Sequence, residues 1–172
     1  MDLASTVRGV PDFPIEGILF YDITTLLKNS TALKSSIDQF THRYRDAGVD
    51  MIVGIESRGF IFGMPLAYQL GVGFVPVRKP GKLPAETIAE SYTLEYGSNT
   101  LEIHVDAIQA GQKVLVVDDL LATGGTAKAT CSLIEKLGGE VIGLAFAIEL
   151  NFLNGRQRLS GYDIFSLIRY DE

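Results

Sequence analysis

The sequence predicts an α/β fold in which a mostly parallel, twisted sheet is flanked by helices. Strand-like and helix-like segments alternate along the chain, and this alternation is typical of parallel sheets joined by crossover helices. Three of the strand-like segments are continuous apolar runs, as expected for strands buried on both faces, and they lie at residues 51–55, 114–117 and 141–150. A chain of 172 residues is expected to form a single domain, residues 1–172.

The chain before the first apolar run predicts one short strand and one helix. Residues 1–30 contain GVPDFPIEG, a stretch punctuated by proline and glycine, followed by an apolar run at 18–23 that is consistent with a strand. A helix is expected at 31–47, with Ser30 as its N-cap, because apolar residues recur there at helical spacing.

The remaining elements follow the apolar runs in a regular order. Mostly apolar or amphipathic segments at 60–70 and 126–137 predict helices after the first and second runs. Strands are expected at 71–77 and, after a polar connection, at 162–169. Helices between successive parallel strands should cover both faces of the sheet.

One polar excursion interrupts this order. Residues 78–101 are richer in Lys, Pro, Gly and Glu than their flanks, and two alternating runs at 91–96 and 100–105 predict a hairpin. Such an excursion is either a plain surface insertion or a lid over a site.

Composition excludes several classes of function. Fifteen Lys and Arg against 21 Asp and Glu give a net charge of -6, so a general nucleic-acid binder is not expected. One cysteine excludes an internal disulfide and a Cys-based zinc cluster, and two histidines, His42 and His104, leave little for a His-rich metal site. The apolar runs are too short for a membrane helix and the N-terminus is not a signal peptide, so we expect a cytoplasmic protein without a membrane partner.

The most informative loop follows the second apolar run. Its sequence, Ala122-Thr123-Gly124-Gly125-Thr126, stands where a buried strand turns into a helix. Glycines let several backbone N–H groups point inward, the helix dipole adds positive potential, and the threonines add hydroxyl donors. The loop is therefore expected to bind a phosphate group, although it lacks the ending of a Walker loop. An ordinary glycine turn is the alternative.

Two acids and a second loop extend this site. Asp118 and Asp119 come directly after the apolar run, and carboxylates beside a phosphate fit the hydroxyls of a sugar, with Mg²⁺ easing the repulsion. Glu56-Ser57-Arg58-Gly59 has the same placement after the first run and offers a hydroxyl, a guanidinium and N–H groups to a second phosphate. Two anion sites on one sheet edge predict a sugar that carries phosphates at both ends.

These motifs together resemble a known family. VLVVDDLLATGGT (114–126) is similar to the phosphoribosyl-pyrophosphate motif of the type I phosphoribosyltransferases. FPIEGILFYDIT, GIESRGF (54–60), RKPGKLP (78–84) and SYTLEYG (91–97) resemble the adenine-specific members, in the same order and over nearly the whole chain.

The resemblance implies a fold, a reaction and an assembly. The fold would be the type I phosphoribosyltransferase fold, with a small N-terminal hood (1–30) that binds the base and a mobile hairpin lid (79–105). The reaction would convert adenine and 5-phosphoribosyl 1-pyrophosphate to AMP and pyrophosphate in purine salvage, with Mg²⁺ as cofactor. The protein would be a homodimer. Two alternatives stay open: transfer to hypoxanthine, guanine or xanthine, or a non-catalytic regulator that senses phosphoribosyl pyrophosphate.

The resemblance also implies roles for individual residues. The 5-phosphate would lie on Ala122, Thr123, Gly124, Gly125 and Thr126, and the ribose on Asp118 and Asp119. Pyrophosphate would lie on Glu56, Ser57, Arg58, Gly59, Lys79 and Lys82. Adenine would lie on Leu19, Phe20 and Tyr21, with Phe20 stacking on the base, although many relatives carry Arg in place of Tyr21. Glu95 and Arg58 would be catalytic, Tyr96 would belong to the lid, and Mg²⁺ would be held mainly by substrate oxygens and water near Asp118 and Asp119.

Overall fold

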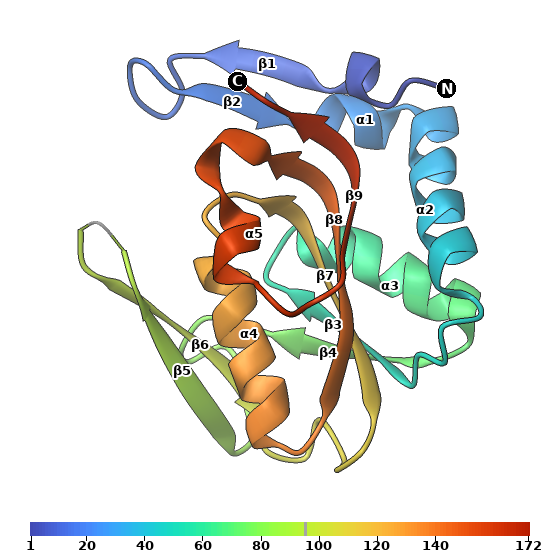
Figure 1. Cartoon of the computed structure of the whole chain (residues 1–172), viewed down its shortest axis with the longest axis vertical. Helices are drawn as coiled ribbons and strands as arrows, with labels where there is room; N and C mark the ends of the chain where they lie inside the picture. Colours follow the sequence, from blue (N-terminus) through green and yellow to red (C-terminus); the bar gives the residue numbers. More distant parts are fainter. Residues whose placement is uncertain (95) are drawn as a thin grey trace.

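The computed structural model describes residues 1–94 and 96–172 and contains a five-stranded sheet whose strands are all parallel. The strand order is β4-β3-β7-β8-β9, with crossovers between sequential strands (Figure 1). The strands are β3 (Met51–Ile55), β4 (Gly73–Val77), β7 (Lys113–Leu121), β8 (Glu140–Leu150) and β9 (Ile164–Tyr170). The predicted fold class is confirmed, and the three continuous apolar runs form the three central strands.

Helices cover both faces of this sheet, as predicted. On one face, α2 (Ser30–Tyr44) and α3 (Gly59–Leu70) pack on alternate residues of β7 through a cluster that includes Leu115. On the other face, α4 (Gly125–Lys136) packs on the intervening residues of β7, such as Val116. The period of two along a strand thus divides the apolar side chains of β7 between two cores.

A small antiparallel sheet lies in the N-terminal segment, residues 1–30, that was predicted to be a hood, and we keep that name for it. It consists of β1 (Arg8–Pro11) and β2 (Leu19–Asp22), preceded by the 3-10 helix η1 (Ala4–Thr6) and followed by α1 (Thr24–Lys28). Figure 1 shows this sheet at the top, beyond the carboxyl ends of β8 and β9. The hood therefore lies at the sheet edge where ligands of parallel α/β folds bind.

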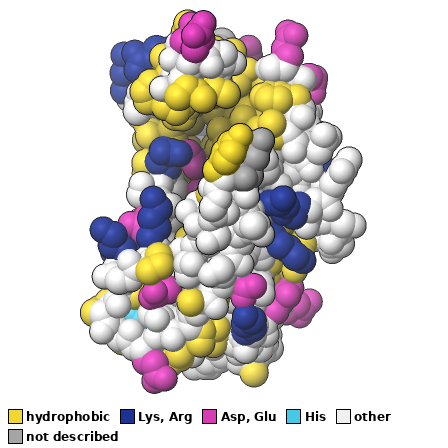
Figure 2. Space-filling view, turned by 90° about the vertical axis from the view of Figure 1, so that its left-hand side faces the viewer, with side chains coloured by type: hydrophobic (Ala, Val, Ile, Leu, Met, Phe, Trp, Pro, Cys, Tyr) yellow, Lys and Arg dark blue, Asp and Glu magenta, His cyan; other side chains and the backbone are white. Residues whose placement is uncertain are grey.

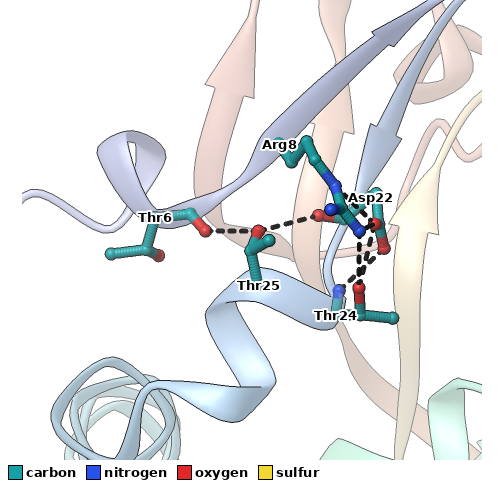
Figure 3. A network of polar contacts seen from close by, with 5 residues as sticks. All are labelled: Thr6, Arg8, Asp22, Thr24 and Thr25. Carbon is teal, nitrogen blue, oxygen red and sulfur yellow. Dashed lines mark hydrogen bonds and ion pairs between the residues drawn. The ribbon is translucent and has the colours of Figure 1, made fainter.

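A polar network holds the hood together (Figure 3). Asp22 accepts hydrogen bonds from Arg8 Nε at 3.0 Å and from the Thr24 backbone N–H at 2.9 Å. These bonds, first of all the one from Arg8, lower the pKa of Asp22 to about 2. The hydroxyl of Thr25 donates to the carbonyl of Thr6 at 2.7 Å, which joins α1 to the chain before β1.

A hairpin projects beside α4 at the opposite edge of Figure 1 from α2. Its strands are β5 (Thr87–Thr93) and β6 (Ser98–His104), paired antiparallel. The hairpin was expected, but its first strand begins and ends earlier than predicted, because the ladder runs from the Thr87–His104 pair at the base to the Thr93–Ser98 pair near the tip. His104 has a structural position there, since its Nε2 accepts the Ala85 N–H at 3.3 Å.

Other boundaries also differ from the prediction. The N-cap of α2 is Asn29 and not Ser30, because the Asn29 side chain accepts the N–H groups of Thr31 and Ala32. Asp118 and Asp119 lie inside β7 and not after it, since the strand continues pairing with β8 as far as Leu121.

The polar connection after β8 contains short helical turns, η2 (Asn151–Leu153) and α5 (Gly155–Arg158). Over the part of the chain that the structure describes, no helix combines the length and the apolar character needed to cross a membrane.

Candidate active site

A cavity of about 480 Å³ opens at the carboxyl ends of β3 and β7. It brings together most of the residues predicted for the phosphates and the ribose, together with three hairpin residues: Glu56, Ser57, Arg58, Lys79, Tyr92, Leu94, Asn99, Asp118, Asp119, Ala122, Thr123, Gly124, Gly125 and Thr126. Gly59 and Lys82 do not contribute to this lining. We call this space the phosphate cavity.

The predicted phosphate loop forms the start of α4. Gly124 is the N-cap residue and has φ of 85°, a left-handed conformation that glycine adopts without the steric cost of a Cβ atom. Gly124 has no side chain with which to cap this helix end, and the first N–H groups of any α-helix have no intrahelical acceptor. Backbone donors and the positive end of the helix dipole therefore meet at the cavity, an arrangement suited to an anion.

The back of the phosphate loop is supported by α5. A Cβ atom on Gly155 would lie 2.4 Å from the Ala122 carbonyl oxygen, and one on Gly124 would lie 2.8 Å from the Gly155 carbonyl oxygen. The two backbones are thus in direct contact, and only glycine at both positions permits it. The position of α5 therefore fixes the position of the loop.

An ion pair in turn anchors α5. Glu149, at the end of β8, is only 2% exposed and accepts hydrogen bonds from Arg156 Nη2 at 2.8 Å and Ser166 Oγ at 2.7 Å. Burial opposes ionisation of Glu149, but Arg156, Ser166 and Arg169 outweigh it and lower the pKa. Sequence reasoning missed this anchor; its signal was a single acid at the end of an apolar strand, followed by an arginine-rich turn.

The two acids of β7 have different environments. Asp119 is buried and accepts a 2.5 Å hydrogen bond from Arg58 Nε. Asp118 accepts the Asp119 N–H at 2.8 Å. Burial, and then the neighbouring charge of Asp119, raise the pKa of Asp118 well above its usual range. The pair therefore presents one carboxylate neutralised by Arg58 and one group that retains a proton more readily.

Glu56 connects the first loop to the basic segment 78–84. Its carboxylate accepts from Arg78 Nη2 at 2.8 Å and from the Lys79 N–H at 2.9 Å. Both bonds, that from Arg78 first, lower the pKa of Glu56. Glu56 thereby holds Lys79 at the cavity, while Ser57 and Arg58 provide the hydroxyl and guanidinium of the loop.

A second cavity of about 450 Å³ lies under the hood, and we call it the hood cavity. It is mainly apolar and aromatic and is lined by Val10, Phe13, Phe20, Tyr21, Asp22, Ile23, Thr24 and Arg58. Phe13 and Phe20 meet edge to face with ring centroids 5.1 Å apart. Figure 2 shows hydrophobic side chains gathered on the hood, above a hollow in this face of the molecule. Such a space suits a flat, aromatic ligand.

The other two residues predicted to bind the base, Leu19 and Tyr21, differ from Phe20 in their contacts, although Tyr21 also lines the hood cavity. Leu19 is 48% exposed and is not part of the lining. Tyr21 stacks on Tyr170 with ring centroids 3.8 Å apart, and its hydroxyl donates to the Glu172 carbonyl at 2.9 Å. The polar end of Tyr21 is therefore engaged with the C-terminal segment. Phe13 was not predicted to line this cavity, because the proline and glycine residues of the surrounding GVPDFPIEG stretch indicate only a turn.

Among the described residues, Arg58 is the one that lines both cavities. In the hairpin, which was predicted to be a lid, Tyr96 is 88% exposed, and Glu95 lies outside the described residues. Among the residues that the structure describes, no three His, Cys, Asp or Glu side chains gather as a metal-binding group.

Comparisons with known proteins agree with this geometry. The family described as a phosphoribosyl transferase domain matches residues 22–168. An adenine phosphoribosyltransferase from Acaryochloris marina is 62% identical over 170 residues, which cover 99% of this chain and 100% of that protein. The structure of adenine phosphoribosyltransferase from Thermoanaerobacter pseudethanolicus matches with a TM-score of 0.95 at 55% identity, covering 98% of each chain. The Saccharomyces cerevisiae enzyme, solved with an imino-altritol bisphosphate and adenine, matches with a TM-score of 0.91 at 46% identity, covering 96% of each chain.

The fold and the two cavities, with this family match, define a type I phosphoribosyltransferase. The chain belongs to the adenine phosphoribosyltransferases, which form AMP and pyrophosphate from adenine and phosphoribosyl pyrophosphate. The family and the reaction predicted from the motifs are confirmed. The other-purine and regulator alternatives are not favoured, because the similar proteins and structures are adenine enzymes.

Proposed function

We propose that the transfer of the phosphoribosyl group to adenine takes place where the two cavities meet at Arg58. The observation that carries this proposal is the position of Arg58, which lines an anion-binding space on one side and an aromatic space on the other. A base in the hood cavity and a sugar phosphate in the phosphate cavity would meet beside this side chain.

The proposed sugar phosphate position uses both motif loops. The 5-phosphate would bind the N–H groups of residues 122–126, and the ribose hydroxyls would bind Asp118 and Asp119. Pyrophosphate would lie against Ser57, Arg58 and Lys79. Glu56 would act by holding Lys79, consistent with the two donors that its carboxylate accepts.

The proposed base position uses aromatic stacking. Adenine would lie in the hood cavity against Phe20 and Phe13, while backbone groups of β2 read its edge. Two aromatic rings give a flat base a large contact area at little cost in conformational entropy. The hydroxyl of Tyr21 would support the hood and not bind the base, in keeping with its bond to Glu172.

The chemistry needs positioning more than covalent catalysis. Displacement of pyrophosphate at the anomeric carbon passes through an oxocarbenium-like transition state, so the site must align the reactants and stabilise the leaving group's charge. Arg58 would supply positive charge for that purpose. We further propose that Glu95 handles the proton of the purine nitrogen, and that the hairpin excludes water as a competing nucleophile.

Mg²⁺ is the proposed cofactor. The oxygens of Asp118 and Asp119 are hard ligands of the kind that Mg²⁺ prefers, although Arg58 already binds one oxygen of Asp119. The residues fit a cation that takes one or two carboxylate oxygens and completes its shell with phosphate oxygens and water. When bound, the ion would neutralise charge on the pyrophosphate group.

The proposed assembly is a homodimer formed through α3. Ile61, Met64 and Tyr68 lie on one face of this helix and are 39%, 51% and 84% exposed. Exposed apolar side chains at such spacing mark an interaction surface. Sedimentation of the wild type and of Y68K would test it, and a monomeric wild type would contradict it. The cytoplasmic location stays a prediction.

The activity test offers four purines to one enzyme preparation. The protein is incubated with phosphoribosyl pyrophosphate, Mg²⁺ and either adenine, hypoxanthine, guanine or xanthine, and nucleotides are separated by chromatography. AMP from adenine, with little product from the 6-oxo purines, is expected. E95Q should lose most turnover while retaining substrate binding, and near-normal turnover would rule out its proposed catalytic role. Absence of AMP from the wild type would contradict the proposed function.

A further inference from the structure

Tyr92 on β5 contacts the phosphate loop from the hairpin. Its hydroxyl lies 2.7 Å from Thr126 Oγ1, and Asn99 Nδ2 lies 3.4 Å from the same Tyr92 oxygen. The ring packs against the start of α4, since a Cβ atom on Gly125 would lie 2.9 Å from Tyr92 Cδ2. Tyr92 thus connects two segments that are 34 positions apart in the sequence.

The contact constrains where the proton of Thr126 can point. A threonine hydroxyl has one proton, and either hydroxyl can be the donor in the Tyr92–Thr126 bond. A phosphate group in the loop offers acceptors, so Thr126 would donate to it. Tyr92 must then donate to Thr126, and this direction agrees with Asn99 acting as donor to Tyr92.

We propose that Tyr92 is a positioning residue for the 5-phosphate, because it orients the Thr126 hydroxyl and ties the hairpin to the occupied loop. This inference rests on the proposed placement of the 5-phosphate at residues 122–126. Hydrogen bonds arranged in one direction polarise and strengthen one another, so the chain from Asn99 through Tyr92 to Thr126 improves the final donor. By linkage, an occupied loop also stabilises the hairpin contact.

The test measures binding of ribose 5-phosphate by calorimetry, without adenine or Mg²⁺. Y92F keeps the ring and removes the hydroxyl, and we expect an increase in Kd of about three- to tenfold, the range of one ordinary hydrogen bond. Binding of inorganic pyrophosphate to Y92F should equal that of the wild type. S91A is the matched control, because Ser91 makes a comparable 2.8 Å hydroxyl bond to Thr100 on the same hairpin but outside the cavity.

A double-mutant cycle separates positioning from a merely structural role. In a T126V background, Y92F should cause no further loss of affinity, because the hydroxyl through which it acts is absent. Hydrogen exchange supplies an independent readout: ribose 5-phosphate should slow exchange in β5 and β6 of the wild type and have a smaller effect in Y92F.

Each outcome has a distinct meaning. Equal affinity of the wild type and Y92F, or a full Y92F penalty in T126V, would overturn the role of Tyr92 and leave the placement of the phosphate intact. A wild type that does not bind ribose 5-phosphate would overturn that placement, and this inference with it. If Y92F folds poorly, exchange in the wild type decides: no protection of β5 and β6 by the ligand would overturn the inference.

Discussion

Replacing Gly155 with alanine tests whether α5 determines the shape of the phosphate loop. The added Cβ atom would lie 2.4 Å from the Ala122 carbonyl oxygen and 2.8 Å from Leu121 Cδ1. The first contact is with backbone, so no side-chain rotation can relieve it. Either α5 or the loop at Ala122 must move.

The size of the effect follows from two opposing contributions. Alanine in a helix is ordinarily more stable than glycine by about 0.5–1 kcal/mol, which favours the variant. Inserting a methyl group into a filled space costs about 1–3 kcal/mol, and the upper part of that range applies because the contact is with backbone. We expect a net loss of about 1–2 kcal/mol, or roughly 2–8 °C in Tm for a chain of this size.

The assay combines thermal unfolding with binding of ribose 5-phosphate. G155A should lower Tm and also weaken binding, because the displaced carbonyl belongs to the phosphate loop. G161A is the control, since Gly161 lies in the same connection with φ of 94° and no atom within 4 Å of an added Cβ. G161A should lose stability through backbone strain but keep its affinity. A G155A variant with raised Tm and unchanged affinity would refute the reasoning.

Three further predictions concern the acids, the base and the α5 anchor. D118N should gain stability relative to the wild type as pH rises above about 4, the usual carboxyl pKa, because the raised folded-state pKa of Asp118 gives the wild type stability at low pH that is lost as pH rises; parallel Tm curves would contradict this. F20A should raise the KM for adenine about tenfold and leave that for phosphoribosyl pyrophosphate little changed, whereas F152A, on exposed Phe152, should alter neither. R156A should lower the free energy of unfolding, measured by urea denaturation, by about 1.5–3 kcal/mol, because Glu149 loses two hydrogen bonds. R169A should lower the free energy of unfolding by a smaller amount.

The central strands could be predicted because their signal is local. The runs in β3, β7 and β8 are apolar on both faces, so consecutive apolar residues indicate a buried strand without reference to any distant contact. By contrast, β1 (Arg8–Pro11) carries no alternating pattern and is a strand only because it pairs with β2. The polar end of β7 was also missed, since pairing with β8 and not side-chain burial extends that strand through Asp118 and Asp119.

The candidate site also has parts that could be predicted from the sequence and parts that could not. The loops at 56–59 and 122–126 were recognisable because each places its chemistry directly after an apolar strand. The support behind them depends on contacts distant in sequence, such as the approach of Gly155 to Ala122 and the Tyr92–Thr126 bond. The pairing of Arg58 with Asp119 likewise depends on β3 and β7 being neighbours, which the order of segments along the chain does not specify.

The shared position of Arg58 has a consequence for inhibitor design. Since Arg58 lines both the hood cavity and the phosphate cavity, a compound that joins a flat aromatic group to a charged sugar mimic through a linker can be designed to fill both. The second group then binds at a high effective concentration, so affinity rises well beyond that of either half. The linker must pass the guanidinium, and an acceptor atom placed there would compete with Asp119 for Arg58. Compounds built in this way would distinguish enzymes that place an arginine at this boundary from those that do not.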